Sequence, residues 1–287
     1  MNYQLAHYSL RGSRPTNEDR AAVAERDNAV LMVLADGLGG HRGGEIAAEI
    51  LTQALVRAFR SVRAAVITRP SAFLALAILQ AHTAIGRHAA ASRPRLEPRT
   101  TCVACLVQDG YAYWAHVGDS RLYHFRGKRL MRRTQDHSTI EQMRQDGLLT
   151  EEEMQSHPQK GRLTKCVGGP NKPTISLGEE TALQRDDVLL LCTDGVWEAH
   201  APEALRHYLE QPSIEEAVED MLHGAERKMK GSSDNLSAVC LRWQEDKPAG
   251  VPLQGNAETV VDEKTLWDTA AHVSATLKHG NRKNRDS

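Results

Sequence analysis

Acidic residues stand where predicted buried strands begin or end, and this placement most constrains how the chain folds. The apolar run Ala29–Ala35 stops at Asp36, and a strand over Asp187–Cys192 is followed by Asp194. Asp234 directly precedes a third strand. One Asp before Gly or Asn is an ordinary turn former. Several at the ends of neighbouring core strands lie side by side, and gathered carboxylates repel one another unless a cation lies between them.

Two more acidic motifs extend this pattern. Glu18 and Asp19 precede a strand, and Asp119 lies in a Gly-Asp-Ser-Arg turn between two strands. The set offers carboxylate oxygens and contains no Cys or His. Such hard ligands favour Mg²⁺ or Mn²⁺ over Zn²⁺. The residues alone therefore predict a site for hard divalent cations.

The order of the predicted elements indicates an α+β fold. Apolar residues between Ile46 and Phe59 recur at the spacing of one helix face, and a second helix follows Pro70. Short β-branched and aromatic segments between Thr100 and Arg133 predict an antiparallel meander. A polar, helix-prone stretch over Ser138–Pro158 follows. Strands before, between and after the helices favour sheets covered by helices over a doubly wound parallel sheet.

Composition sets the domain boundary and excludes several classes of protein. We predict one domain over residues 1–243, and over 244–287 a linker with a flexible C-terminal tail, because Pro and Gly accumulate after Trp243. The 36 Lys and Arg nearly balance 37 Asp and Glu, which argues against a nucleic-acid partner. No apolar run approaches the ~18 residues that span a membrane. With no export signal and five scattered Cys, we expect a cytoplasmic monomer.

An ordered set of short motifs resembles the metal-dependent protein phosphatases of the PP2C-like family, in their bacterial form. The resemblance covers residues 1–243 and rests on the motifs around Arg14 to Asp19, Ala35 to His41, Gly118 to Arg121, Cys192 to Gly195 and Ser233 to Asn235. It implies an αββα sandwich, in which two central antiparallel β-sheets are flanked by helices. It also implies hydrolysis of phosphoserine and phosphothreonine with two Mn²⁺ or Mg²⁺ ions.

The resemblance implies a role for each residue of these motifs. Asp36 would bridge the two ions, with the carbonyl of Gly37 completing one coordination sphere. Asp194 and Asp234 would hold the other ion, while Glu18 and Asp19 would act through water. Asp19 would orient the bridging water for in-line attack, without a covalent phosphoenzyme. A third, weaker metal site would use Asp119 with Asp194, and Arg14 would grip the substrate phosphate.

Two histidines keep more than one interpretation. Family members with a His directly after the Asp-Gly have a candidate general acid there, whereas this chain has Leu38. His41 either contacts the substrate or shapes its own loop. For His137 we favour a role in positioning a loop. The stretch from Thr139 to Gly161 corresponds to the family's flap beside the active site.

Other classes of function fit the sequence less well. A thiol-based tyrosine phosphatase needs an Arg six residues after its Cys, and none of the five Cys has one; Cys166 comes nearest, with Lys172. A dinuclear nuclease would share the carboxylates but would need a basic channel. An inactive PP2C-like scaffold would have lost the metal-binding Asp residues, and all of them are present.

Partners follow from the resemblance and from the tail. We expect phosphoproteins as substrates and a Hanks-type Ser/Thr kinase as the opposing enzyme. Thr259 and Asp262 have the phosphothreonine-x-x-Asp spacing that forkhead-associated domains bind. The alternative is an accidental match in a polar tail.

Overall fold

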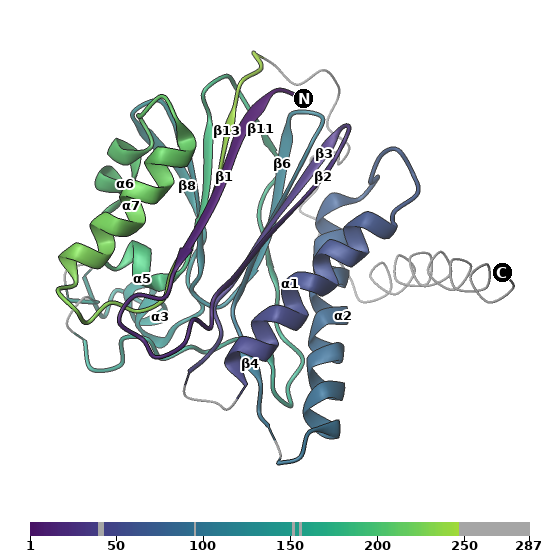
Figure 1. The fold of residues 1–287 in the computed structure, drawn as a ribbon, viewed down its shortest axis with the longest axis vertical. Coiled ribbons are helices and arrows are strands. Elements are labelled where there is room, and N and C mark those ends of the chain that lie inside the picture. The colour runs from purple at the N-terminus through teal and green to yellow at the C-terminus, as the bar shows by residue number, and fades with distance from the viewer. Residues whose placement is uncertain (40–42, 95, 151–152, 155–156, 247–287) are drawn as a thin grey trace, which may run out of the picture.

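The structure, a computed structural model, describes residues 1–39, 43–94, 96–150, 153–154 and 157–246. Two antiparallel sheets stand face to face in its centre (Figure 1). The first sheet has the order β1-β13-β12-β7-β8. Its strands are β1 (Tyr3–Leu10), β13 (Leu236–Trp243), β12 (Val188–Cys192), β7 (Arg121–Arg126) and β8 (Arg129–Arg133).

The second sheet has the order β10-β6-β5-β3-β2, and β11 (Thr181–Ala182) also pairs with β6. Its strands are β10 (Ser176–Leu177), β6 (Tyr111–Val117), β5 (Cys102–Gln108), β3 (Ala29–Ala35) and β2 (Arg20–Arg26). A separate short pair joins β4 (Arg99–Thr100) to β9 (Val167–Gly168). Every strand pairing described is antiparallel, which excludes a doubly wound parallel sheet.

Helices cover the outer faces of both sheets (Figure 1). The helices α1 (Gly44–Ser61) and α2 (Pro70–Ala91) pack on the second sheet. The helices α5 (Asp194–Trp197), α6 (Pro202–Tyr208) and α7 (Ile214–Lys228) pack on the first. A third apolar layer fills the space between the sheets. This layering confirms the αββα sandwich that the resemblance implied.

Alternation along the strands explains why three apolar layers form. Side chains of a strand point to opposite faces in turn, so a strand buried on both faces is apolar throughout. Strand β5 shows this: Cys102 faces the α1–α2 layer and Cys105 faces the layer between the sheets. The opposite orientation of these two thiols was expected, and it excludes a shared metal site for them.

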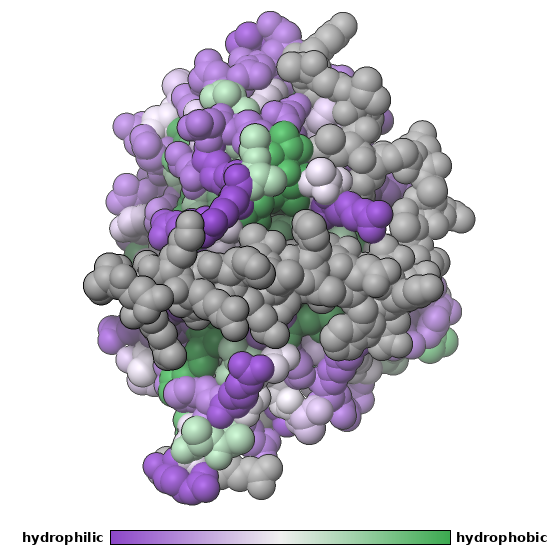
Figure 2. Space-filling model, turned by 90° about the vertical axis from the view of Figure 1, so that its right-hand side faces the viewer, coloured by the Kyte–Doolittle hydropathy of each residue, from purple (hydrophilic) through white to green (hydrophobic). Residues whose placement is uncertain are grey.

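Figure 2 shows the side of the molecule that carries α1 and α2, where hydrophilic residues predominate among the described ones and smaller hydrophobic areas lie between them. On α1 the buried side chains follow one face, including Leu51, Leu55 and Phe59. No helix among the described residues is long and apolar enough to cross a membrane.

Two sequence expectations need correction. The strands between Thr100 and Arg133 are not one meander, because β5 and β6 belong to the second sheet and β7 and β8 to the first. The turn at Gly118, whose φ is 104°, carries the chain from one sheet to the other. Within the helix-prone stretch, the described α-helix that begins it, α3, covers only Thr139–Gln145.

Strand register brings the predicted acidic residues to one end of the sandwich. In the first sheet, Cys192 lies opposite both Arg121 and Ala238, so Asp194, Asp119 and Asp234 follow or precede neighbouring strand ends. In the second sheet Ala35 lies opposite Arg20, which places Asp36 beside Asp19. Residues far apart in the sequence therefore meet at a common edge.

Candidate functional site

Five of the predicted site residues line one cavity of 260 Å³ at this end of the sandwich. They are Arg14, Glu18, Asp36, Gly37 and Asp234. Asp19, Asp194 and Asp119 do not line the cavity; the charges of Asp194, Asp19 and Asp119, in that order, act on Asp36. The structure thus gathers the carboxylates as the sequence predicted.

Two threonines fix Asp36 where β3 ends. The N–H of Asp36 donates to Thr101 Oγ1 at 3.0 Å, and the carbonyl of Asp36 accepts from the N–H of Thr101 at 2.8 Å. Thr100 Oγ1 donates to the same carbonyl at 2.8 Å. With its backbone held on both sides, Asp36 presents its carboxylate to the cavity.

A chain of buried hydroxyl contacts holds Asp19. Thr193 Oγ1 donates to Asp19 Oδ2 at 2.9 Å and accepts from the N–H of Ser237 at 3.1 Å. Thr193 directly precedes Asp194. One hydroxyl therefore links the strand ends that carry Asp19 and Asp194.

The N-terminal loop is tied to the start of β13 by a single amide. Asn235 Nδ2 donates to the carbonyls of Arg11 at 2.8 Å and Thr16 at 2.9 Å. Its Oδ1 accepts from the N–H of Glu18 at 2.8 Å. These three bonds set the course of the loop that presents Arg14 and Glu18.

Arg14 and Asp234 form an ion pair at the mouth of the cavity. Arg14 Nη2 donates to Asp234 Oδ2 at 2.6 Å, and the Arg14 side chain is 54% exposed. Asp234 Oδ1 accepts from the N–H of Asn235 at 2.8 Å. The guanidinium therefore lies close to the carboxylates, at the end of a side chain that is half exposed to solvent.

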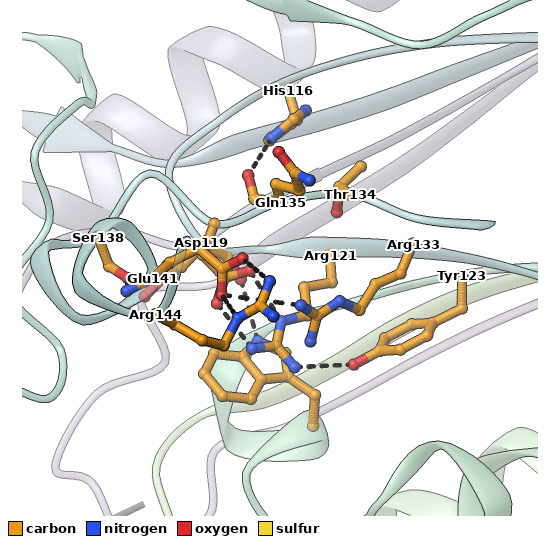
Figure 3. Close-up of polar contacts among 12 residues, drawn as sticks. His116, Asp119, Arg121, Tyr123, Arg133, Thr134, Gln135, Ser138, Glu141 and Arg144 are labelled. Carbon is orange, nitrogen blue, oxygen red and sulfur yellow. Dashed lines mark hydrogen bonds and ion pairs between the residues drawn. The ribbon is translucent and has the colours of Figure 1, made fainter. Parts of the chain in front are cut away.

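Asp119 lies in a buried polar group beside the cavity. Its carbonyl accepts from Trp197 Nε1 at 3.0 Å. Arg121 stacks on the ring of Trp197 at 3.5 Å and binds Asp136 through two bonds of 2.7 and 2.8 Å. Figure 3 shows Arg121 reaching from this group to the hydroxyl of Tyr123. Turn residues 118–120 are thus anchored from several sides.

Crowding and burial disfavour the charged forms of the acidic residues. Burial and then the charge of Asp194 raise the pKa of Asp36 well above its ordinary value. Burial and then the charge of Asp119 do the same to the pKa of Asp194. Burial raises the pKa of Asp19 and of Asp119 to about 7. A bound cation would reverse this balance, because opposite charge favours the ionised carboxylate.

The donor set fits hard divalent cations. Glu18 Oε2 and Asp19 Oδ1 are buried, and neither has a hydrogen-bond partner among the described residues. Such orphaned oxygens are costly unless a ligand satisfies them. In the described part of the chain, no three His, Cys, Asp or Glu side chains stand together as ligands of one ion. Mg²⁺ usually takes one or two carboxylates and keeps several waters, so a three-ligand cluster is not required.

The two histidines fare differently. His41 lies outside the described residues. The N–H of His137 donates to the carbonyl of Gly118 at 2.8 Å, and its Nδ1 accepts from the N–H of Gly118 at 3.1 Å. His137 therefore holds the turn that carries Asp119, in agreement with the expected positioning role.

Sequence reasoning missed the residues that position the carboxylates. Thr101, Thr193 and Asn235 form the contacts described above, and Thr193 and Asn235 were noted only as parts of motifs. Thr193 and Asn235 are each next in sequence to a predicted ligand, and this adjacency could have identified them as positioning residues. Thr101 had no such neighbour, because strand pairing alone brings it beside Asp36.

Known proteins similar to this chain are protein phosphatases. A model of the protein phosphatase 2C family matches residues 8–240. The serine/threonine protein phosphatase PstP of Mycobacterium tuberculosis is 31% identical over 272 residues, covering 92% of this chain and 50% of PstP. The chain thus spans about half the length of this curated relative.

Solved structures agree in fold. The structure of the serine/threonine phosphatase Stp1 from Staphylococcus aureus has a TM-score of 0.79 at 26% identity, over 85% of this chain and 96% of that one. The catalytic domain of PstP in complex with two manganese ions has a TM-score of 0.69 at 26% identity, over 85% and 99%.

Proposed function

Because this chain belongs to the protein phosphatase 2C family, we propose that it is a metal-dependent phosphatase of phosphoserine and phosphothreonine proteins. One observation carries the proposal: Arg14, whose side chain is half exposed, places its guanidinium at the mouth of a cavity lined by carboxylates. A phosphate monoester is an anion, and carboxylates alone would repel it. Arg14 together with bound cations makes the same cavity attractive to phosphate.

In this proposal Asp36, the carbonyl of Gly37, Asp194 and Asp234 hold two ions, with Glu18 acting through water. Bound Mn²⁺ or Mg²⁺ supplies Lewis acidity, which activates water and offsets charge on the phosphate. The choice between the two metals, and a third ion at Asp119 and Asp194, also belong to the proposal. The buried orphan oxygen of Glu18 supports it.

The protein's own groups orient the reactants. Arg14 exchanges its bond to Asp234 for a phosphate oxygen, which a planar fork of donors binds well. Asp19 is fixed through Oδ2 by Thr193, so its partnerless Oδ1 is available to accept a hydrogen bond from the attacking water. In this proposal water attacks phosphorus directly, without a covalent intermediate. His41 remains a candidate for substrate contact.

The partners belong to the same proposal. The relatives named above are serine/threonine phosphatases. We therefore propose phosphoproteins as substrates, an opposing Hanks-type kinase and action as a cytoplasmic monomer. The predicted tail, with Thr259 and Asp262 as a docking point for a forkhead-associated domain, lies almost wholly outside the described residues. The domain boundary after residue 243 also belongs to the proposal, and the end of β13 at Trp243 supports it.

Hydrolysis of a phosphothreonine peptide with and without Mn²⁺ tests the function. Wild type is expected to require the metal, and Asp194→Asn to lose most of its activity. Asp186→Asn is the matched control, because Asp186 is exposed and its φ of 66° suits Asn equally well. Activity that survives EDTA would overturn the metal mechanism. Normal Mn²⁺ binding by calorimetry without hydrolysis would favour the inactive scaffold instead.

A further inference from the structure

A second cavity, of 860 Å³, opens at one edge of the sandwich. Its lining shares no residue with the 260 Å³ cavity of the candidate site. It lies where the edge strands β8 and β10 leave the space between the sheets uncovered, and α3 and residues 164–165 add further walls. Its volume falls within the range of pockets that bind small organic molecules.

The layer between the sheets changes from apolar to polar at this edge. Along β6, Ala112 and Trp114 belong to the apolar layer, whereas the next residue on that face, His116, lines the cavity. His116 is 5% exposed and stacks on His137 with 4.6 Å between the ring centroids. Figure 3 shows its ring bonded to the carbonyl of Gln135. The other ring nitrogen of His116, Nδ1, is buried and has no hydrogen-bond partner among the described residues, and an unpaired polar atom of this kind points to a polar occupant.

One cation at the cavity has no partner. Lys165 makes no hydrogen bond or ion pair with any residue that the structure describes, and its charge helps to lower the pKa of both His116 and His137. The pKa of His137 falls to about 3, chiefly through burial, so its ring stays neutral.

The acidic residues around the cavity leave this charge without an ion-pair partner. Asp136 is bound by Arg121, and Glu179 by Arg132 at 2.5 Å. The remaining acid, Asp146, is exposed at the C-terminal end of α3. An anionic group beside Lys165 would therefore complete the charge balance at the histidine end of the cavity.

Part of the cavity wall is aromatic and apolar. Trp114 lies two residues from His116 on the same face of β6, which separates them by about 7 Å along the strand. Met131, which is 39% exposed, lines the cavity as well. The complementary molecule has an anionic group and an apolar or aromatic body.

We propose that this cavity binds a small organic anion, with the charged group at Lys165 and the apolar part at Trp114, and that His137 couples its occupancy to Asp119. The two hydrogen bonds between His137 and Gly118 provide the coupling, because Gly118 directly precedes Asp119. His137 Nδ1 accepts from that N–H, so Nε2 carries the proton and donates to Ser176 Oγ at 2.9 Å. The effect on catalysis rests on the proposed function, whereas the binding does not.

Nuclear magnetic resonance of the ¹⁵N-labelled full chain in EDTA tests the binding without any catalysis. The probes are AMP, inorganic phosphate and adenosine, and the signals are the ring nitrogens of His116 and His137. AMP is expected to shift these signals saturably, phosphate to act more weakly, and adenosine to have little effect. Lys165→Ala should weaken AMP binding by about tenfold or more, as the loss of a charged contact does.

Matched variants separate this cavity from the candidate active site. Lys128→Ala removes an exposed lysine that does not line the cavity and should leave AMP binding unchanged. Arg14→Ala should also leave it unchanged. Circular dichroism establishes that Lys165→Ala is folded.

Defined results would overturn the proposal. Absence of ring shifts, equal binding of AMP by Lys165→Ala, equal binding of adenosine, or loss of the shifts in Arg14→Ala would each overturn the site. Ring shifts without a parallel shift of the 118 and 119 amides would overturn the coupling.

Discussion

The side-chain amide of Asn235 accepts a hydrogen bond of 2.8 Å from the backbone N–H of Glu18, across 217 residues of sequence. The same amide donates to two carbonyls of the N-terminal loop. Asn235 is 6% exposed, so water cannot replace these bonds easily. The position of the Glu18 carboxylate relative to Asp234 therefore depends on a residue outside the proposed set of metal ligands.

Asn235→Ala should weaken Mn²⁺ affinity or activity about 10–100-fold, as loss of supporting contacts around metal ligands typically does. It should also lower the free energy of unfolding by about 1–3 kcal/mol, because it leaves a buried N–H and two carbonyls without partners. Mn²⁺ titrations of phosphopeptide hydrolysis and urea unfolding measure the two effects. Asn28→Ala, in the turn between β2 and β3, is the control. Wild-type metal dependence in Asn235→Ala would contradict the positioning role.

Thr193→Val should show that one hydroxyl supports Asp19. Valine keeps the shape of threonine but can neither donate to Asp19 Oδ2 nor accept from the N–H of Ser237. We expect a loss of about 1–3 kcal/mol in unfolding free energy and a higher Mn²⁺ requirement. Thr193→Ser keeps the hydroxyl and should stay near wild type in metal requirement. If both variants show the same metal requirement, the hydroxyl has no such role.

The sequence predicted much of this fold because local patterns carry it. The seven apolar residues Ala29–Ala35, which stop before Asp36, indicated a core strand, and the apolar face of residues 46–59 indicated a helix. The pairing of the strands was not local: Leu10 lies opposite Leu236, and no short-range pattern encodes that. The stacking of the two sheets came from the family resemblance. The change of sheet at Gly118 was missed, because the sequence of a turn is the same type whether the strands on either side pair with each other or belong to different sheets.

The candidate site also has a part that local sequence patterns predict and a part that they do not. Carboxylates at strand ends could be predicted, because a residue type and its place in a strand are both visible in a sequence. Contacts such as that of Thr101 with Asp36 depend on strand register. The 860 Å³ cavity could not be predicted, since residues of the edge strands of two different sheets line it.

Asp36→Asn should raise the thermal stability of the metal-free protein while abolishing activity. Burial and neighbouring carboxylates raise the pKa of Asp36 and Asp194, so their ionised forms destabilise the fold when no cation is bound. Removing one charge relieves this repulsion. Thermal unfolding in EDTA should therefore show a higher Tm for the variant, and Mn²⁺ should stabilise it less than wild type. Asp27→Asn, an exposed change, should alter neither value; a lower Tm for Asp36→Asn in EDTA would be the contrary result.

Asp187 should make stability depend on acid pH. Burial alone would raise the pKa of Asp187, but the bonds from Arg126, the nearby His124 and the N–H of Gln184 outweigh it and lower the pKa. Its stabilisation is thus fully present above the unfolded value of about 4 and is lost as pH falls through the folded value. Asp187→Asn should cost about 1–3 kcal/mol near neutral pH. The gap to wild type should shrink in acid.

Unfolding of both proteins by urea across this pH range measures the Asp187 effect. Asp246→Asn is the control, because Asp246 pairs with Arg185 on the exposed surface and should contribute little. A gap between wild type and Asp187→Asn that stays constant down to the lowest pH would exclude an ionic origin.

Substitution of glycine by alanine should have opposite effects on stability at two positions in neighbouring helices. A Cβ on Gly44, the first residue of α1, would lie 2.5 Å from Glu18 Oε2 and 2.9 Å from the carbonyl carbon of Gly37. Gly44→Ala must therefore displace Glu18 or the Gly37 loop, at a cost of about 1–3 kcal/mol, and should reduce activity sharply.

Gly86, within α2, has no atom within 4 Å of such a Cβ. Gly86→Ala should stabilise the protein by about 0.5–1 kcal/mol, because Ala favours the helix, and should leave activity unchanged. Urea unfolding and phosphopeptide hydrolysis of the two variants measure both effects, and full activity in Gly44→Ala would show that the close approach of α1 to Glu18 is not needed for the site.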